Sequence, residues 1–243
     1  MKKINIQVED FSYALEEALN RLRVNLKFSG KDTKKILITS SFPNEGKSRV
    51  TVDLWRMLAE AGIPTVLVDA DMRKTLLKKR HHIEGVDKNK DIGCYLTGIA
   101  EYEDVVYETN IENAYCVPCV NTVENPSVLL EDGRLKELLD RLSMEYRYVL
   151  VDTPPLDSVA DGSVIASLCD GAILVVEAGK IPKKFISESL SQLDSAECRV
   201  LGMVLNKVQL ENIPYKKYYG KYKKYGYKYQ YESDEKKQKA SDK

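Results

Sequence analysis

Apolar residues along this chain follow two alternating patterns. Short, continuous apolar runs are typical of strands that are buried on both faces of a sheet. We expect such strands at 34–40, 64–71, 114–120, 148–155, 171–179 and 198–208. Apolar residues at helical spacing predict helices at about 47–61, 131–146, 161–170 and 183–195. This alternation indicates an α/β fold, with a mostly parallel central sheet and helices on both of its faces.

One more helix is predicted before the first of these strands, at residues 12–28. Four leucines repeat there at helical spacing, and Ser12 precedes them as a candidate N-cap. We therefore expect one side of this helix to pack on the core. Its charged residues form a solvated face unless they have a function in assembly.

The alternating pattern stops near residue 210, which predicts one domain at 1–210 and a tail at 211–243. Residues 214–231, "PYKKYYGKYKKYGYKYQY", contain eight of the fifteen tyrosines, six lysines and no acidic residue. The segment lacks the aliphatic residues needed for a core, so the tail is predicted to be disordered. A tyrosine-rich segment of this kind is a solvated tail, a strip that binds nucleic acid or a membrane, or a substrate.

Charge is unevenly distributed along the 243 residues, although the formal net charge is zero. Residues 214–243 contain ten lysines and four acidic residues, a net charge of +6, so the rest of the chain carries −6. This distribution argues against a globally basic nucleic-acid-binding protein. No apolar run approaches the roughly 20 residues that span a bilayer, so we expect a cytoplasmic protein. The five cysteines are scattered and odd in number, which does not suggest a disulfide framework.

A candidate phosphate-binding loop lies between the first predicted strand and its helix, in "ILITSSFPNEGKS" (36–48). Ser41 stands where the usual G-x-x-x-x-G-K-[ST] pattern has its first glycine. The chemistry survives this change, because backbone amides and a helix N-terminus still surround an anion. Asn44 occupies a turn position at which a left-handed backbone is expected, and asparagine tolerates that conformation. The predicted nucleotide-binding residues are Pro43, Asn44, Glu45, Gly46, Lys47 and Ser48.

Polar residues also end three other predicted strands. Asp69 and Asp71 end "VLVDAD", and Asp152 ends "VLVD". The carboxyl ends of parallel strands line the ligand crevice of such a sheet, so these acids are expected to face phosphates and a metal ion. Alternatively, they cap the helices that follow. Asn206 ends the last strand and is expected either to contact the adenine or to cap the strand.

These stretches resemble the Walker A, A′ and B motifs of bacterial tyrosine kinases. The three motifs read apolar-S-x-x-P-x-E-G-K-S, apolar-D-x-D-x-R and apolar-D-x-P, and similarity extends over roughly 12–208, including "NPSVLL" at 125–130. The resemblance is closest to the stand-alone cytoplasmic kinases of capsule and exopolysaccharide synthesis. It implies a P-loop NTPase fold and an ATP- and Mg²⁺-dependent protein-tyrosine kinase.

The resemblance also suggests a role for each site residue. Ser48, Asp69 and Asp152 are the expected metal-binding residues, and Lys47 is expected to contact the β- and γ-phosphates. Asp69 is expected to assist the phenol, whose pKa near 10 makes it a poor nucleophile at neutral pH. Asp71 is an alternative for that last role, and the sequence does not separate the two.

In this family the C-terminal tyrosines are autophosphorylated by a neighbouring subunit. The expected acceptors are Tyr215, Tyr218, Tyr219, Tyr222, Tyr225, Tyr227, Tyr229 and Tyr231. Each phosphate adds about −1.5 to −2 charge, so three or four would cancel the charge of +6 on 214–243. The resemblance further implies other protein-tyrosine substrates and a membrane-embedded activator of the polysaccharide co-polymerase type. Such an activator would hold the kinase at the inner face of the cell membrane.

Two positions depart from the family pattern. Asn44 replaces the usual glycine of the loop. The E-x-x-R-x-x-R element, associated with ring-like homo-oligomers, becomes Glu17, Asn20 and Arg23 here, with asparagine in place of the first arginine. We therefore expect assembly through the helix at 12–28, with its strength altered by Asn20.

Two other classes of protein are considered beside the kinase. A switch ATPase of the ParA/MinD kind shares the acid positions, but it carries a second lysine in the loop where this chain has Phe42. A binding module for single-stranded nucleic acid would use the aromatic and basic tail. The rest of the chain has no nucleic-acid-binding feature, so we predict no nucleic-acid partner.

Overall fold

The computed structural model describes residues 2–75, 82–123 and 125–208. The predicted tail at 211–243 therefore lies outside the described residues, and its boundary stays a prediction. The described residues form one eight-stranded sheet. Its strands are β1 (Lys2–Ile4), β2 (Lys35–Ser40), β3 (Thr65–Asp69), β4 (Tyr107–Thr109), β5 (Ala114–Val117), β6 (Tyr148–Asp152), β7 (Gly171–Glu177) and β8 (Val200–Asn206).

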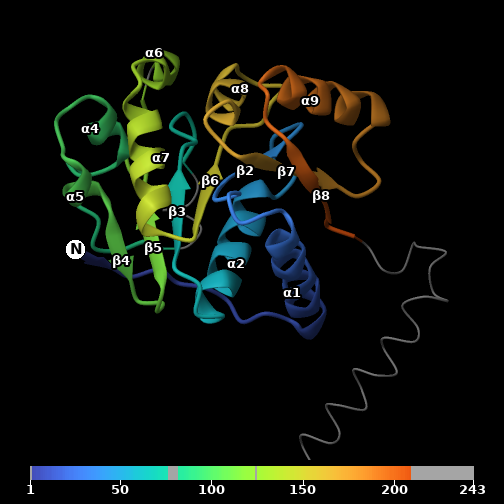
Figure 1. The fold of residues 1–243 in the computed structure, drawn as a ribbon, viewed down its shortest axis with the longest axis horizontal. Coiled ribbons are helices and arrows are strands. Elements are labelled where there is room, and N and C mark those ends of the chain that lie inside the picture. The colour runs from blue at the N-terminus through green and yellow to red at the C-terminus, as the bar shows by residue number, and fades with distance from the viewer. Residues whose placement is uncertain (1, 76–81, 124, 209–243) are drawn as a thin grey trace, which may run out of the picture.

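The sheet is mostly parallel, as predicted. The strand order is β1-β4-β5-β3-β6-β2-β7-β8, and β4–β5 is the antiparallel pair. The phosphate-loop strand β2 lies between β6 and β7, and β6 also pairs with β3. The strands β3, β6 and β2, which lead to the predicted aspartates and the phosphate loop, are therefore neighbours in the middle of the sheet, whereas Asn206 ends the edge strand β8 (Figure 1).

Helices cover both faces of this sheet (Figure 1). They are α1 (Tyr13–Phe28), α2 (Lys47–Glu60), α4 (Ile92–Leu96), α5 (Tyr102–Val105), α6 (Pro126–Glu131), α7 (Arg134–Glu145), α8 (Asp161–Ala166) and α9 (Lys183–Ser195). One face packs on α1 and α2, around the fully buried Trp55. The other face packs on α4 to α9. The α/β fold class is thereby confirmed.

The N-terminal helix forms as its sequence indicates. The Ser12 side chain accepts a hydrogen bond from the backbone N–H of Leu15 at 3.4 Å, which satisfies one of the free donors at the helix start. Leu19 and Leu26 are buried against the sheet, and Leu15 and Leu22 are partly buried beside them. The predicted apolar side of α1 is confirmed.

Several predicted boundaries were wrong for local reasons. The strand expected at 114–120 ends at Val117, because Pro118 has no N–H to donate to a neighbouring strand. The helix expected at 131–146 begins at Arg134, because Gly133 takes a left-handed conformation (φ 80°) and separates α6 from α7. The helix expected at 161–170 ends at Ala166.

The last strand, β8, differs from the prediction of burial on both faces. It lies at the edge of the sheet, and none of its residues is fully buried. Met203 and Leu205 are 59% and 61% exposed. Strands β1 and β4 were not predicted at all. Each has three residues, too few for a periodic pattern to be recognised.

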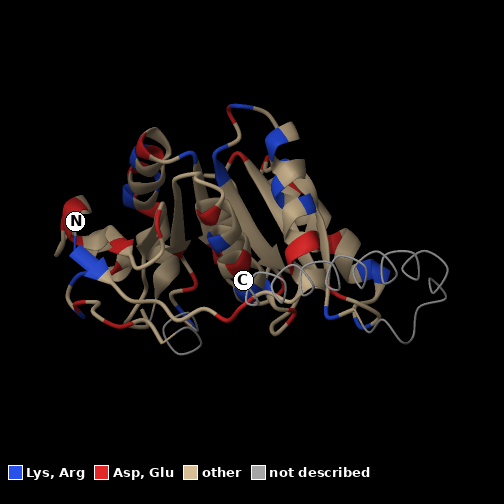
Figure 2. Cartoon of the chain, turned by 90° about the horizontal axis from the view of Figure 1, so that it is seen from below, with Lys and Arg blue, Asp and Glu red and all other residues tan. Residues whose placement is uncertain are grey.

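Charged residues lie on the helices and loops around the sheet and on the short strand β1 (Figure 2). The central strands β2, β3, β6 and β7 carry charges only at their ends. Among the described residues, no helix is both long enough and apolar enough to cross a membrane.

Candidate active site

The phosphate loop connects β2 to α2, and two of its residues have left-handed backbones. Gly46 is the N-cap of α2 with φ 97°, and a Cβ there would lie 2.1 Å from Nδ2 of Asn206. Glycine is therefore required by both the backbone conformation and the close approach. Asn44 has φ 68°, which confirms the conformation predicted for it. Asparagine thus adopts here a left-handed conformation, which glycine also tolerates.

Glu45 closes the loop through a buried side chain. Its carboxylate accepts one hydrogen bond from the backbone N–H of Phe42 at 2.7 Å and another from that of Glu177 at 2.8 Å. Its backbone carbonyl accepts a hydrogen bond from Nδ2 of Asn206 at 2.8 Å. The sequence located Glu45 and Asn206 in the site but did not predict these contacts. In this structure the amide group of Asn206 holds the loop through the Glu45 carbonyl. The contact of Asn206 with adenine stays a prediction.

Lys47 lies at the centre of the site and is only 8% exposed. Its Nζ donates to Oδ2 of Asp71 at 3.0 Å and lies 3.7 Å from Oδ1 of Asp152. It also lies 3.3 Å from the Ser48 hydroxyl. Burial lowers the pKa of Lys47, but the carboxylates of Asp152 and Asp71 outweigh burial and raise the pKa above its ordinary value. The lysine therefore keeps its charge although it is buried.

Asp69 and Asp152 face each other across the β3–β6 ladder, where they are paired in register. Burial raises the pKa of both carboxyls, and mutual repulsion raises that of Asp69 further. Oδ2 of Asp69 accepts a hydrogen bond from the Thr75 hydroxyl at 2.6 Å, and this hydroxyl also lies 3.1 Å from the carbonyl of Cys119. Sequence reasoning missed Thr75. The one indication in the sequence was a hydroxyl-bearing residue six positions after Asp69.

The predicted acids and Lys47 thus meet in one buried cluster at the carboxyl ends of the strands. Three carboxylates (Asp69, Asp71 and Asp152) share a single lysine, and the Ser48 hydroxyl is adjacent. Among the described residues, no three His, Cys, Asp or Glu side chains are arranged to hold a metal ion without other ligands. Mg²⁺ suits such a site, because it takes oxygen ligands and usually shares one or two carboxylates with substrate phosphates.

Arg73 joins three segments at the edge of this cluster. Its guanidinium donates to Asp161 at 2.7 and 3.1 Å and to the Ser127 hydroxyl at 3.0 Å. The Ser127 hydroxyl in turn donates to Asp161 at 2.8 Å. The loop after β3 is thereby connected to the starts of α6 and α8. The sequence placed Arg73 in the D-x-D-x-R motif and Ser127 in "NPSVLL", but it did not predict that they contact Asp161.

The remaining predicted residues lie away from the cluster or outside the described residues. Glu17, Asn20 and Arg23 lie on α1, where Arg23 donates to the Asn20 side chain at 3.1 Å. Glu17 is exposed. The eight predicted acceptor tyrosines belong to 209–243, outside the described residues.

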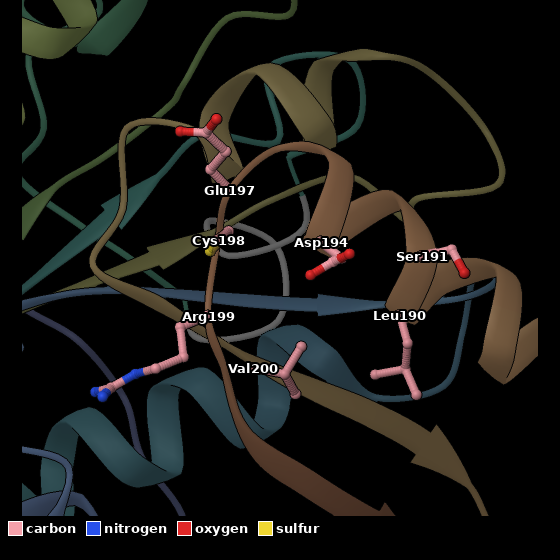
Figure 3. A pocket seen from close by; sticks show the side chains of 7 residues that line it. All are labelled: Leu190, Ser191, Asp194, Glu197, Cys198, Arg199 and Val200. Carbon is pink, nitrogen blue, oxygen red and sulfur yellow. The ribbon is translucent and has the colours of Figure 1, made fainter.

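A hollow of about 710 Å³ lies between the end of α9 and the start of β8 (Figure 3). It is lined by Leu190, Ser191, Asp194, Glu197, Cys198, Arg199 and Val200. Arg199 turns away from the two acids and donates to the carbonyl of Ser29. The phosphate loop contacts the opposite end of β8, at Asn206, so this hollow is separate from the candidate active site.

A glycine-capped loop that opens a helix, followed by acids at the ends of adjacent parallel strands, defines a P-loop nucleotide-binding protein. Comparison with known proteins agrees. A family model described as AAA domain matches residues 33–199. Tyrosine-protein kinase CpsD of Streptococcus agalactiae is 36% identical over 87% of this chain and 90% of its own length.

Two solved structures are also similar. The chimerical protein CapA2B2 has a TM-score of 0.75 at 27% identity, covering 84% of this chain and 92% of that one. The kinase domain of the Escherichia coli tyrosine kinase ETK has a TM-score of 0.72 at 26% identity, covering 80% and 78%. This chain belongs to the bacterial tyrosine-protein kinase family, and the kinase prediction is confirmed over the switch-ATPase alternative.

Proposed function

We propose that this kinase transfers the γ-phosphoryl group of ATP to the tyrosines of its own C-terminal segment and thereby regulates the synthesis of a capsular or extracellular polysaccharide. The observation that carries this proposal is the buried contact of Lys47 with Asp71 and Asp152 beside a helix N-terminus. Such a site binds phosphates and a cation together. The relatives named as tyrosine-protein kinases support the choice of tyrosine as acceptor.

The chemistry assigned to the site is an in-line transfer. The phenol oxygen forms a bond to the γ-phosphorus, the bond to the ADP oxygen breaks, and the phenol proton passes to a carboxylate. We assign that proton to Asp69. Asp71 is instead engaged by Lys47 at 3.0 Å, which supports this division of roles.

Metal binding is assigned to residues with oxygen donors. Ser48 and Asp152 would hold Mg²⁺ together with the phosphates, and Asp69 is the third candidate. The bound ion would neutralise charge that develops on the phosphates. Lys47 contributes a positive charge beside Ser48 and Asp152. We assign to this charge the orientation of the β- and γ-phosphates.

Assembly is assigned to the outer face of α1. Tyr13 and Phe28 are 58% and 83% exposed at its two ends, and Glu17 is exposed between them. We propose that this face contacts a second copy. An apolar contact there compensates for the arginine that Asn20 replaces. Assembly also brings the tail of one subunit to the active site of another.

A membrane-embedded activator of the polysaccharide co-polymerase type is proposed as the partner, with the kinase at the inner face of the cell membrane. The family resemblance supports this partner. Other protein-tyrosine substrates are expected beside the tail.

The test is to incubate the purified protein with labelled ATP and Mg²⁺, with and without the activator, and to map phosphate by mass spectrometry. We expect label on tyrosines between 215 and 231. Deleting 214–243 should abolish self-labelling and leave nucleotide binding intact, because the last described strand, β8, ends at Asn206. The Lys47→Met protein should not label itself, but it should be labelled by the active, tail-deleted protein. The proposal fails if nucleotide binds and none of the eight tyrosines carries phosphate.

A further inference from the structure

The ends of the last two strands hold the phosphate loop from outside. Nζ of Lys207 donates to the backbone carbonyl of Asn44 at 2.5 Å, and Nδ2 of Asn206 donates to that of Glu45 at 2.8 Å. The backbone N–H of Glu177, at the end of β7, donates to the Glu45 carboxylate at 2.8 Å. Two successive loop residues are therefore fixed by contacts that come from β7 and β8.

Lys207 reaches the loop because its backbone is left-handed, with φ 54°. A residue with a side chain adopts this conformation at a cost of roughly 1 kcal/mol or more, so other contacts must hold it. Nζ of Lys207 also pairs with the Glu177 carboxylate at 2.9 Å. This ion pair is part exposed and contributes little by itself. The contact of Lys207 with the Asn44 carbonyl ties the end of β8 to the loop, beside the contact that Asn206 makes with the Glu45 carbonyl.

These contacts set the direction of the loop's amide groups. In a trans peptide, the carbonyl and the following N–H point in opposite directions. A carbonyl of Asn44 turned towards Lys207 directs the N–H of Glu45 away from Lys207. In the same way, the carbonyl of Glu45 turned towards Asn206 directs the N–H of Gly46 away from that residue. Within the described part of the chain neither N–H has a hydrogen-bond acceptor, so both are free for phosphate oxygens.

We propose that Lys207 is a positioning residue, which together with Asn206 and Glu177 holds the loop in the conformation that binds nucleotide phosphates. This inference rests on the proposed nucleotide-binding role of the loop. The ends of the strands thus hold the loop in addition to the contacts that its own residues make.

Lys180 is a matched control for Lys207. Its Nζ pairs with the other oxygen of the Glu177 carboxylate at 3.0 Å, as Lys207 does at 2.9 Å, and it makes no contact with the loop among the described residues. Replacing either lysine by methionine removes one positive charge and one ion pair with Glu177. Only the Lys207→Met change removes the hydrogen bond to the Asn44 carbonyl.

The experiment measures the Kd of Mg·ADP for the full-length protein by isothermal titration calorimetry. We expect Lys207→Met to raise the Kd about five- to twentyfold, the loss of one hydrogen bond from a charged donor. Lys180→Met should change the Kd by less than about twofold, as for an exposed ion pair. Lys207→Arg keeps the charge and a donor, and should recover most of the affinity. In labelling assays, the KM for ATP should rise in Lys207→Met while kcat at saturating ATP is retained.

Equal effects of Lys207→Met and Lys180→Met would show a general effect of charge and overturn the inference. Lys47→Met distinguishes this result from a failure of the proposed function. If Lys47→Met binds Mg·ADP as the wild type does, the loop is not the phosphate site and both proposals fall. If Lys47→Met loses binding and Lys207→Met retains it, the positioning role of Lys207 alone is refuted.

Discussion

Removing the Arg73 guanidinium should destabilise the domain through the carboxylate that it leaves behind. Asp161 is 2% exposed and accepts two hydrogen bonds from Arg73, at 2.7 and 3.1 Å. A hydrogen bond to a charged group contributes about 1.5–3 kcal/mol. The Arg73 side chain is 36% exposed, so solvent screens part of the interaction, and Ser127 still donates to Asp161 in the variant. We therefore expect Arg73→Met to lower the free energy of unfolding by about 2–3 kcal/mol at pH 7.

The effect should depend on pH in a defined direction. Burial raises the pKa of Asp161, but the hydrogen bonds from Arg73 and Ser127 outweigh burial and lower it below its ordinary value. A depressed pKa contributes stability that is present above the unfolded pKa, near 4, and is lost as the pH falls through the folded pKa. The difference between wild type and Arg73→Met should thus be full at pH 7 and shrink below about pH 4.

Urea unfolding followed by tryptophan fluorescence measures this difference, because Trp55 is the one tryptophan of the chain and is fully buried. The control is a double-mutant cycle in which Arg73→Met is made in an Asp161→Asn background. There we expect a loss of less than about 1 kcal/mol, since the buried charge is gone. A loss that is the same in both backgrounds, or that does not change with pH, would refute the reasoning.

Two further predictions follow from single contacts. Thr75→Val removes the hydroxyl that donates to Asp69, and should lower kcat about ten- to a hundredfold with little change in the KM for ATP. Thr75→Ser keeps the hydroxyl and should retain activity. Equal losses of kcat in the two variants would contradict a role for the hydroxyl. Glu17→Lys should shift the protein towards monomer in sedimentation velocity, with Asn25→Lys, exposed on another side of the same helix, as the control. A wild-type protein that already sediments as a monomer would exclude assembly by the isolated chain.

The amino-acid sequence by itself determined the local elements and the identity of most site residues. Continuous apolar runs located the central strands because strands buried on both faces leave no polar positions. The left-handed turn at Asn44 was predictable from residue type, since few side chains tolerate that conformation. Strands β1 and β4 have three residues each, too few to show a periodic pattern, so the sequence did not predict them.

Only the tertiary structure decided which distant residues act on the site. The Asn44 carbonyl is held by a lysine 163 positions later, and the Glu45 carboxylate by a backbone N–H 132 positions later. Arg73 meets a carboxylate 88 positions away. No pattern along the chain encodes such pairs, because they arise when β7, β8 and the start of α8 are brought beside the loops by sheet order. The order of strands, which places β2 between β6 and β7, is set by packing over the whole domain rather than by any local run of residues.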